Sequence, residues 1–451
     1  MIGKKFIYEN ILLDEARRVV SFVYRIETDE EEFQLTEKVT FASTLPDNPT
    51  IDRHLRALHL ALGISYYKIF VPPKIDHAYR MDEKEAVFWN IVFRHGLGEF
   101  LYKNNLPASK LARFTAQKGS VIPDNSDSVE WKQRALLGIG GGKDSIVAGE
   151  LLKEIALPVS GFVLATGTHQ GLARNVAKTM RVELHGIERE IDPLLLELNR
   201  REGAFNGHIP ISLIFALSGC LLAASRGDKY VVVANEASAS IPQVEHEGEA
   251  VNHQWSKSFD FETLFQDYVH GYLSVQLHYF SAIRPLSSVA VAKIFARYPN
   301  YFSVFTSDNS HFKMNRETRK HPRWSHDSPK TLSSFILLSP WIDPSTLIEA
   351  FGENYLEQQD LSQLLLDLLG KGEKPVLDCV GTPHELRLCL SIASSNKAYA
   401  TSSLVNYARN QGLLMDDIDA MLAGALRISS EHAIPDSIAA HLLEKMEEKL
   451  R

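Results

Sequence analysis

The sequence has few cysteines and no excess of positive charge. Its 451 residues contain only Cys220, Cys379 and Cys389, which are too few and too scattered for a disulfide framework or a classical zinc finger. We therefore expect a reducing compartment. Lysine and arginine total 48 against 56 for aspartate and glutamate, a net charge of −8, so nucleic acids and anionic lipids meet no general attraction. We expect no nucleic-acid partner.

Long apolar segments are also missing. The first twenty residues contain no uninterrupted apolar segment of the kind found in secretory signals. Residues 209–225 carry no charge, but these 17 residues fall short of the roughly 20 that a spanning helix needs. They also include Pro210 and Gly219, so a buried helix fits them better. These absences predict a cytoplasmic protein that does not cross or bind a membrane.

The length, about three times that of a usual domain of roughly 150 residues, predicts two or three domains. Residues 1–120 begin with strand-like alternation and continue with helical patterns, so we expect a small N-terminal α+β domain. Within it, residues 52–62 are predicted to form a helix that stops at Gly63, followed by a short strand over residues 66–71. A polar linker over residues 116–128 marks the boundary.

The pattern then changes to strands alternating with helices across residues 130–340. The apolar runs that we predict to be strands cover residues 135–139, 159–165, 182–187 and 230–234. Continuous apolar runs are typical of parallel strands covered on both faces, which predicts an α/β domain with a doubly wound parallel sheet. Residues 341–451 are rich in leucine, alanine, glutamate and glutamine at helical spacing and predict a helical C-terminal region.

A glycine-rich loop lies where the first of these strands turns into a helix. It reads Gly138-Ile139-Gly140-Gly141-Gly142-Lys143-Asp144-Ser145. Consecutive glycines let backbone N–H groups converge on phosphate oxygens, and the helix N-terminus adds partial positive charge. The Walker A pattern fails because it requires glycine at Leu137 and a hydroxyl residue at Asp144. The Rossmann fingerprint fails because it requires a third glycine at Lys143.

This loop resembles the pyrophosphate loop (PP-loop) of the N-type ATP pyrophosphatases, Ser-Gly-Gly-x-Asp-Ser, with Gly140 in place of the usual serine. The resemblance implies the adenine nucleotide alpha hydrolase-like fold of that superfamily. Its members split ATP between the α and β phosphates, transfer AMP to a substrate oxygen and release pyrophosphate. By resemblance, Lys143 and Ser145 contact the pyrophosphate end of ATP, and Asp144 helps to hold Mg²⁺. The remaining members of the implied ATP-binding set are Gly140, Gly141 and Gly142.

Three further segments place polar side chains where ligands are expected. Asn235 and Glu236 follow an apolar strand, and in an open parallel sheet ligands bind at the carboxyl ends of strands. Residues 251–258 gather amide, imidazole, hydroxyl and ammonium side chains around one tryptophan. Asn206 and His208 precede the apolar helix and offer polar groups at its N-terminus.

Together with residues 62–68 (LGISYYK), 96–100 (GLGEF) and 379–382 (CVGT), these segments resemble the ATP-dependent UDP-N-acetylmuramoyl-L-alanyl-L-glutamate epimerases. The resemblance covers the N-terminal domain and the loop domain. It implies that the chain makes the D-glutamate of bacterial peptidoglycan by inverting the terminal L-glutamate of the nucleotide-linked dipeptide. The implied partners are this small-molecule substrate, ATP and Mg²⁺, whereas the oligomeric state stays open.

Adenylation gives this chemistry a physical basis. A carboxylate opposes formation of a carbanion beside it, whereas the neutral carbonyl of an acyl-adenylate stabilises the enolate. A general base then removes the α-proton, a proton returns on the other face, and hydrolysis releases AMP. His253 and Lys257 are the candidate proton-transfer groups. The candidate residues for binding the substrate or Mg²⁺ are Asn206, His208, Asn235, Glu236, Gln254 and Ser256.

One departure from that family concerns cysteine. Its members carry four cysteines, one in an S-C-N motif and three in a C-x-x-C-P-K-C motif. The corresponding positions here are Asp308, Ser325, Ser328 and Thr331. Three ligands without a fourth close a tetrahedral site poorly, so a joint absence predicts that no structural zinc is bound. A harder metal has potential ligands in Asp308, His311, His326 and Asp327, although a hydrogen-bonded loop is the favoured interpretation.

Three alternatives stay open at this point. An amide ligase on the same fold would release AMP only with an amine acceptor, and a tRNA-modifying ATP pyrophosphatase would bind RNA tightly and in a salt-sensitive way. The third is a non-catalytic ATP-binding protein, suggested by Gly140 and the missing cysteines. It would bind the nucleotide without turnover.

Overall fold

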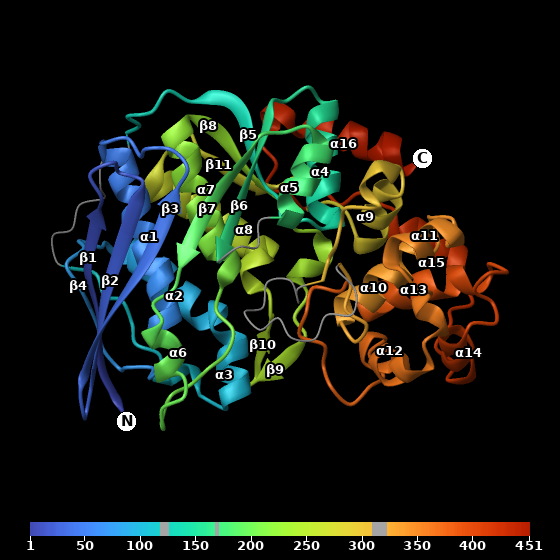
Figure 1. The fold of residues 1–451 in the computed structure, drawn as a ribbon, viewed down its shortest axis with the longest axis horizontal. Helices are drawn as coiled ribbons and strands as arrows, with labels where there is room; N and C mark the ends of the chain where they lie inside the picture. Colours follow the sequence, from blue (N-terminus) through green and yellow to red (C-terminus); the bar gives the residue numbers. More distant parts are fainter. Residues whose placement is uncertain (118–125, 167–170, 309–322) are drawn as a thin grey trace.

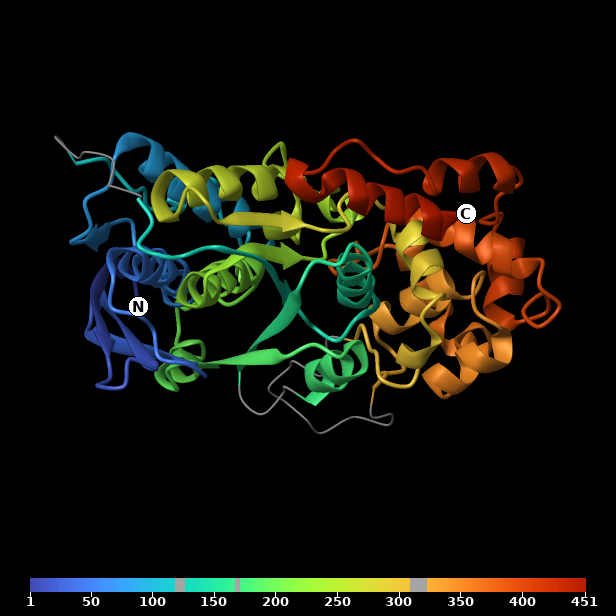
Figure 2. The same ribbon diagram turned by 90° about the horizontal axis from the view of Figure 1, so that it is seen from above.

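The computed structural model describes residues 1–117, 126–166, 171–308 and 323–451. Within these ranges the chain forms a nine-stranded mixed sheet with helices on both faces and a group of helices beside it (Figure 1). The N-terminal strands and the C-terminal helices lie at opposite ends of the molecule, with the parallel strands between them (Figure 2). Most of the predicted linker lies outside the described residues.

The N-terminal region builds the antiparallel half of the sheet and its covering helices. Its elements are β1 (Gly3–Leu13), β2 (Val19–Thr28), β3 (Glu32–Phe41), α1 (Pro49–Tyr67), β4 (Ile75–His77), α2 (Glu83–Gly96) and α3 (Gly98–Asn104). Strands β1, β2 and β3 pair antiparallel in that order, and β4 adds to β1 in parallel at the edge. The strand-like alternation at the start of the chain thus corresponds to β1, β2 and β3, and helices follow them.

The middle of the chain builds the parallel half. Its elements are β5 (Lys132–Gly138), α4 (Lys143–Glu154), β6 (Val159–Thr166), α5 (Gly171–Met180), β7 (Leu184–Glu190), α6 (Leu194–Leu198), α7 (Ile211–Arg226), β8 (Asp228–Val233), β9 (Val244–His246), β10 (Glu249–Val251), α8 (Phe259–Tyr268), β11 (His278–Ser281) and α9 (Ser288–Phe295). Strands β11, β8, β5, β6 and β7 are neighbours in that order and all are parallel. The predicted mixed α/β architecture with a large parallel sheet is confirmed.

The two halves share one sheet. Strand β3 pairs antiparallel with β7 from Lys38 opposite Glu190 to Phe41 opposite Ile187. The sheet order is therefore β11-β8-β5-β6-β7-β3-β2-β1-β4. The domain boundaries at residues 120 and 340 stay predictions, but the strands on the two sides of the first boundary are hydrogen-bonded to each other.

Both faces of the parallel half are covered, as its continuous apolar runs predicted. Successive side chains of a strand point to opposite faces. Leu136 accordingly packs in the core beneath α7 and α8, whereas Ala135 and Leu137 pack in the core beneath α4 and α5. The order of the sheet reverses direction between β5 and β8, because β6 follows on one side of β5 and β8 lies on the other. The carboxyl ends of these two strands meet there, which is where open α/β sheets bind ligands.

The C-terminal region is helical, as predicted. Its helices are α10 (Pro329–Leu338), α11 (Pro344–Phe351), α12 (Ser362–Leu368), α13 (Pro383–Ser394), α14 (Ser403–Asn410), α15 (Ile418–Ala425) and α16 (Asp436–Leu450). They extend the core under α4 and α9 (Figure 1). The apolar segment 209–225 forms α7, whose middle is buried in the other core. Among the described residues, no helix has the length and apolarity to cross a membrane.

The prediction of a helix stop at Gly63 and a strand over residues 66–71 was wrong. Helix α1 continues to Tyr67, and Gly63 is buried within it. A Cβ atom at Gly63 would lie 2.4 Å from the ring of Tyr8, so the glycine allows close packing of the helix on the sheet. The Tyr8 ring has little freedom to move, because it is buried and its hydroxyl donates to the Leu60 carbonyl (3.1 Å).

Gly63→Ala is therefore expected to destabilise the protein by about 1 to 3 kcal/mol through overpacking. Gly424→Ala is the matched control, since it adds the same methyl group to a helix where no atom lies within 4 Å. Helix propensity predicts a gain of up to about 1 kcal/mol for this control. Urea unfolding of both variants measures the difference, and equal midpoints would contradict the packing role of Gly63.

Candidate active site

The glycine loop leaves β5 and enters α4 at the point where the sheet order reverses. Gly142 is the N-cap of α4, and Gly141 has a φ of +98°, a conformation that favours glycine. A Cβ atom at Gly140 would meet nothing within 4 Å. The Thr306 N–H donates to the Gly141 carbonyl (3.0 Å) and fixes the loop from the other side. The loop therefore presents open backbone at a helix N-terminus, an anion-binding arrangement.

Charged side chains surround this loop. Lys143 is buried, and its Nζ lies 2.6 Å from Asp144 Oδ1. Burial disfavours its charge, but the neighbouring carboxylates, first that of Asp144, outweigh this effect and raise the pKa of Lys143. Glu236 follows β8, and burial together with the nearby Glu385 carboxylate raises its pKa to about 7. The Ser145 hydroxyl donates to the Gly142 carbonyl (3.0 Å) in the first turn of α4.

A buried arginine connects the end of β8 to the segment that carries the predicted proton-transfer groups. Arg284 donates from Nη1 to the Glu236 carbonyl (2.9 Å) and from Nη2 to the Lys257 carbonyl (2.6 Å). Its charge is balanced by Glu262, which it contacts through Nε (3.0 Å) and Nη2 (2.8 Å). Both side chains are 1% exposed. One guanidinium therefore ties the backbone at Glu236 to the backbone at Lys257.

Lys257 points toward the C-terminal region. Its Nζ donates to Cys379 Sγ (3.2 Å), and the Cys379 thiol donates to the Gln254 side-chain carbonyl. The Cys379 sulfur raises the pKa of Lys257 and outweighs the opposite effect of burial, and the carboxylates of Asp378 and Asp144 add to the rise. Lys257 is thus an ammonium held between the glycine loop and Cys379.

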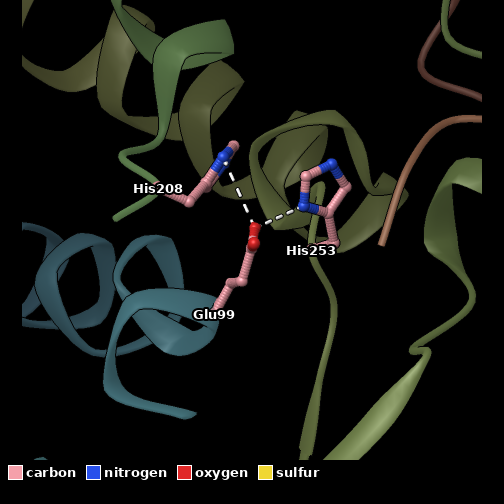
Figure 3. A group of neighbouring side chains, drawn as sticks. All are labelled: Glu99, His208 and His253. Carbon is pink, nitrogen blue, oxygen red and sulfur yellow. Dashed lines mark hydrogen bonds and ion pairs between the residues drawn. The ribbon is translucent and has the colours of Figure 1, made fainter. Parts of the chain in front are cut away.

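His253 lies in a cluster with Glu99 and His208, which come from three separate segments (Figure 3). Its Nδ1 contacts Glu99 Oε2, and His208 Nδ1 lies 3.5 Å from the same oxygen. The other carboxylate oxygen accepts from Lys103 Nζ at 2.5 Å, one turn along α3. The two imidazole centroids are 4.8 Å apart. One carboxylate therefore holds both imidazoles and a cation.

The charges of this cluster have opposite effects on its members. Burial would raise the pKa of Glu99, but the hydrogen bonds from His253 and Lys103 and the charges of the imidazoles hold it at about 2. Burial and then the neighbouring His253 lower the pKa of His208 to about 4. Near neutral pH the cluster accordingly contains an ionised Glu99 and an uncharged His208.

The loop and the cluster belong to one continuous polar site. A ring nitrogen of His253, a carboxylate oxygen of Asp378 and Cys379 Sγ lie within 4.8 Å of one another. Lys257 contacts this Cys379 and interacts electrostatically with Asp144 of the loop. Most of the predicted site residues are therefore brought together.

The other predicted substrate-binding residues lie at the margins of this site. The side-chain oxygen of Asn206 accepts from the buried Lys68 Nζ (3.0 Å), whose pKa burial lowers to about 8. Asn235 is fixed through its backbone, which exchanges hydrogen bonds with the Ser281 hydroxyl. Ser256 is buried in the one-turn 3-10 helix Trp255–Lys257. These contacts position the backbone around the site.

Four residues of the site were not singled out as site residues in the sequence: Glu99, Cys379, Glu385 and Arg284. Glu99 and Cys379 stand within the short segments that carry the family resemblance, which was the available signal. The sequence pattern predicts that Glu385 is the N3 residue of a capping box with Thr382, and the structure contains this capping box. No local pattern distinguishes Arg284 from a surface arginine, because its burial depends on the tertiary fold.

Three of the four positions that carry cysteine in the family, Asp308, Ser325 and Ser328, come together here. The Asp308 carboxylate accepts from the Ser325 N–H (2.7 Å) and from the Ser328 hydroxyl (3.2 Å), at the start of α10. His326 instead lies between Glu353 (3.1 Å) and Asp360 (2.8 Å). His311 lies outside the described residues. The contacts are those of a hydrogen-bonded loop, while the expected lack of zinc stays a prediction.

NMR titration tests the electrostatics of the cluster. The His208 ring should titrate with a midpoint of about 4, well below the ordinary value of about 6.5, because burial disfavours its charge. Substitution of His253 by glutamine should raise this midpoint, since it removes the second cause. His326 is the internal control, because its carboxylate partners raise its pKa. A His208 midpoint near 6.5 would contradict the described burial.

Comparison with known proteins matches the chain along most of its length. The model of the MurL N-terminal domain matches residues 2–282, and that of the MurL C-terminal domain matches residues 304–417. The UDP-N-acetyl-alpha-D-muramoyl-L-alanyl-L-glutamate epimerase of Xanthomonas oryzae pv. oryzae (strain MAFF 311018) is 34% identical over 443 residues, which cover 96% of this chain and 95% of the relative.

Proteins of the same name from two other bacteria are similarly related. The one from Micromonospora sp. (strain ATCC 39149 / NRRL 15099 / SCC 1413) is 32% identical over 89% of both chains. The one from Salinispora tropica (strain ATCC BAA-916 / DSM 44818 / JCM 13857 / NBRC 105044 / CNB-440) is 30% identical over 89% of this chain and 87% of the relative. The chain belongs to the MurL family of UDP-N-acetylmuramoyl-L-alanyl-L-glutamate epimerases.

Proposed function

We propose that this chain is an ATP-dependent epimerase that inverts the terminal L-glutamate of UDP-N-acetylmuramoyl-L-alanyl-L-glutamate through an acyl-adenylate, releasing AMP and pyrophosphate. The relationship to epimerases of that name over 96% of the chain carries the choice of substrate. The polar site that runs from the glycine loop to Glu99 supports the chemistry. The product is the D-glutamate epimer of the same nucleotide-linked dipeptide, for use in peptidoglycan. Because ATP and this dipeptide are the substrates, the proposed compartment is the cytoplasm.

The glycine loop is the proposed ATP site, of the PP-loop type. Two observations fit a pyrophosphate group there: the space above Gly140 is open, and Lys143 remains an ammonium beside it. The positive φ of Gly141 gives the loop a turn that aims backbone N–H groups to one side. The missing serine hydroxyl at position 140 removes one polar contact, which leaves more of the binding to the backbone and Lys143.

Carboxylates suited to Mg²⁺ stand beside the loop. Asp144 and Glu236 both interact with Lys143, and Mg²⁺ prefers oxygen ligands of this kind. A bound Mg²⁺ would neutralise phosphate charge and favour ionised Glu236. The pKa of about 7 for this buried carboxyl fits a group that needs a cation to be fully charged.

The proposed reaction begins when an oxygen of the glutamate α-carboxylate attacks the α-phosphorus of ATP. The bond to the β-phosphate breaks and pyrophosphate leaves. The resulting carbonyl is neutral, so the negative charge of the enolate spreads onto an oxygen that a nearby cation stabilises. Lys257 is well placed for this role, because it is a fixed ammonium between Asp144 and Cys379.

His253 is the proposed acceptor of the α-proton. Glu99 holds its Nδ1, which assigns the proton to that nitrogen and leaves Nε2 as the acceptor. Lys257, whose pKa is raised, is protonated near neutral pH and is therefore suited to return a proton to the opposite face. Solvent then restores both groups, and water hydrolyses the acyl-adenylate to AMP and the D-epimer.

Two substitutions separate the proposed half-reactions. Lys143→Ala should lower pyrophosphate release and inversion together, each by about 10²-fold or more, because both depend on the nucleotide loop. His253→Gln should lower inversion by roughly 10²- to 10⁴-fold, the usual contribution of a general base, while pyrophosphate release continues. Chromatography of AMP and chiral analysis of glutamate after acid hydrolysis measure both quantities.

His441→Gln is the matched control for the histidine variant. His441 is exposed on α16, in the C-terminal group of helices, so this substitution should leave both half-reactions unchanged. Full inversion by His253→Gln would overturn the assignment of the base. AMP release that depends on an added amine or on RNA would instead favour the ligase or tRNA alternative, and nucleotide binding without turnover would favour the non-catalytic one.

A further inference from the structure

A cavity of about 400 Å³ lies directly behind the Glu99–His253 pair. Its walls come from α2, α3, the loop that follows α3 and the β9–β10 hairpin, and it is termed the hairpin pocket below. The lining side chains with the most distinctive chemistry are Arg94, His95, Arg113, His246 and Trp255. His246 Nε2 contacts the Leu106 carbonyl (3.0 Å), which ties the hairpin to the loop after α3.

The hairpin pocket shares its walls with the proposed active site. Gly98 and Asn252 line the pocket, and each is followed directly by a member of the proton-transfer pair, Glu99 and His253. The first turn of α3 thus separates the pocket from the site. A helix with its side chains is about 10 to 12 Å across. The lactyl-alanyl-glutamyl arm of the substrate has three residue-length units and spans about 10 to 11 Å when extended, a length comparable with this width.

The pocket offers aromatic faces for a flat ring. His95 and Trp255 are stacked, with centroids 5.5 Å apart and an interplanar angle of 26°. Phe261 packs edge-on against Trp255 at 5.2 Å and fixes its orientation. His95 is exposed and Trp255 is half-buried, so the stacked pair is accessible from the pocket. Nucleobases bind such surfaces through stacking, whatever their hydrogen-bonding pattern.

Arginines and glutamates both line the pocket: Arg94, Arg113, Glu247 and Glu249. The Arg94 guanidinium pairs with Glu249 of the hairpin through Nε (3.1 Å) and Nη2. Arg113 is exposed, and among the described parts of the chain its side chain has no hydrogen bond or ion pair. A guanidinium binds phosphate oxygens in a bidentate way. Arg113 is accordingly the cation available to an incoming diphosphate.

We propose that the hairpin pocket binds the uridine diphosphate end of the substrate, with uracil on the His95–Trp255 stack and the diphosphate at Arg113. This inference rests on the proposed function and adds to it the site that selects a nucleotide-linked dipeptide over a free one. The sugar then lies at the mouth of the pocket, and the peptide arm crosses the first turn of α3 to His253.

UDP alone is the probe that tests this assignment by calorimetry. The Lys143→Ala protein is compared with the same protein carrying in addition Arg113→Ala or Trp255→Leu. The substitution at Lys143 weakens any binding of UDP to the glycine loop. We expect the Kd for UDP to rise about tenfold or more in each pocket variant, as loss of one charge-assisted contact or one stacked ring predicts. Lys110→Ala is the matched control, because Lys110 is an exposed cation three residues from Arg113 that does not line the pocket.

Kinetics with the full substrate provide the second measurement. The single variants Arg113→Ala and Trp255→Leu should raise the KM for the nucleotide-linked dipeptide about tenfold while kcat and the AMP yield per inversion change little. Unchanged Kd and KM in both variants would overturn the pocket assignment. UDP binding that is absent from the wild type, or that is abolished by Lys143→Ala alone, would also overturn it.

The failure of this inference differs from failure of the proposed function. An active wild-type enzyme whose KM is insensitive to Arg113 and Trp255 contradicts the pocket only. A wild-type enzyme that binds UDP through these residues yet never inverts glutamate contradicts the proposed function and leaves the pocket as a nucleotide diphosphate site.

Discussion

The arrangement of the site depends on a buried ion pair. Arg284 and Glu262 are each 1% exposed, and the charge of either alone would be costly in this core. The guanidinium uses its remaining donors on the carbonyls of Glu236 and Lys257. One planar group thereby ties the backbone that carries Glu236, beside the glycine loop, to the backbone that carries Lys257.

The continuous sheet joins the two regions of the chain that contribute residues to the site. The site takes its loop from β5 and its carboxylate from the N-terminal helix α3, so the two regions must not move independently. The pairing of β3 with β7 joins them, and the buried Glu37–Arg189 ion pair lies across that junction. The Arg189 guanidinium also donates to the Ser65 hydroxyl (2.9 Å) of α1. The N-terminal region that carries Glu99 is therefore joined to the same sheet that carries the glycine loop.

Local patterns in the sequence were enough to predict the glycine loop, the parallel strands and the segment around His253. Glycine spacing and apolar runs extend over only a few consecutive residues, so they can be recognised in the sequence without knowledge of the tertiary structure. Glu99 could not be assigned in this way, because a carboxylate in the first turn of a helix is ordinary and its partner is 154 residues away. Gly63 was misinterpreted for the same reason, since only its contact with Tyr8 distinguishes close packing from a helix stop.

The central claim is that carboxylate activation and inversion occur in one site and depend on each other. Incubation of the enzyme with Mg²⁺-ATP and UDP-N-acetylmuramoyl-L-alanyl-L-glutamate in ²H₂O tests it directly, with mass spectrometry of the glutamate and quantification of AMP. The account predicts that D-glutamate carries solvent deuterium at its α-carbon and that deuterium appears only when AMP does. Deuterated D-glutamate formed without ATP, or AMP released from the substrate without any α-deuterium, would contradict it.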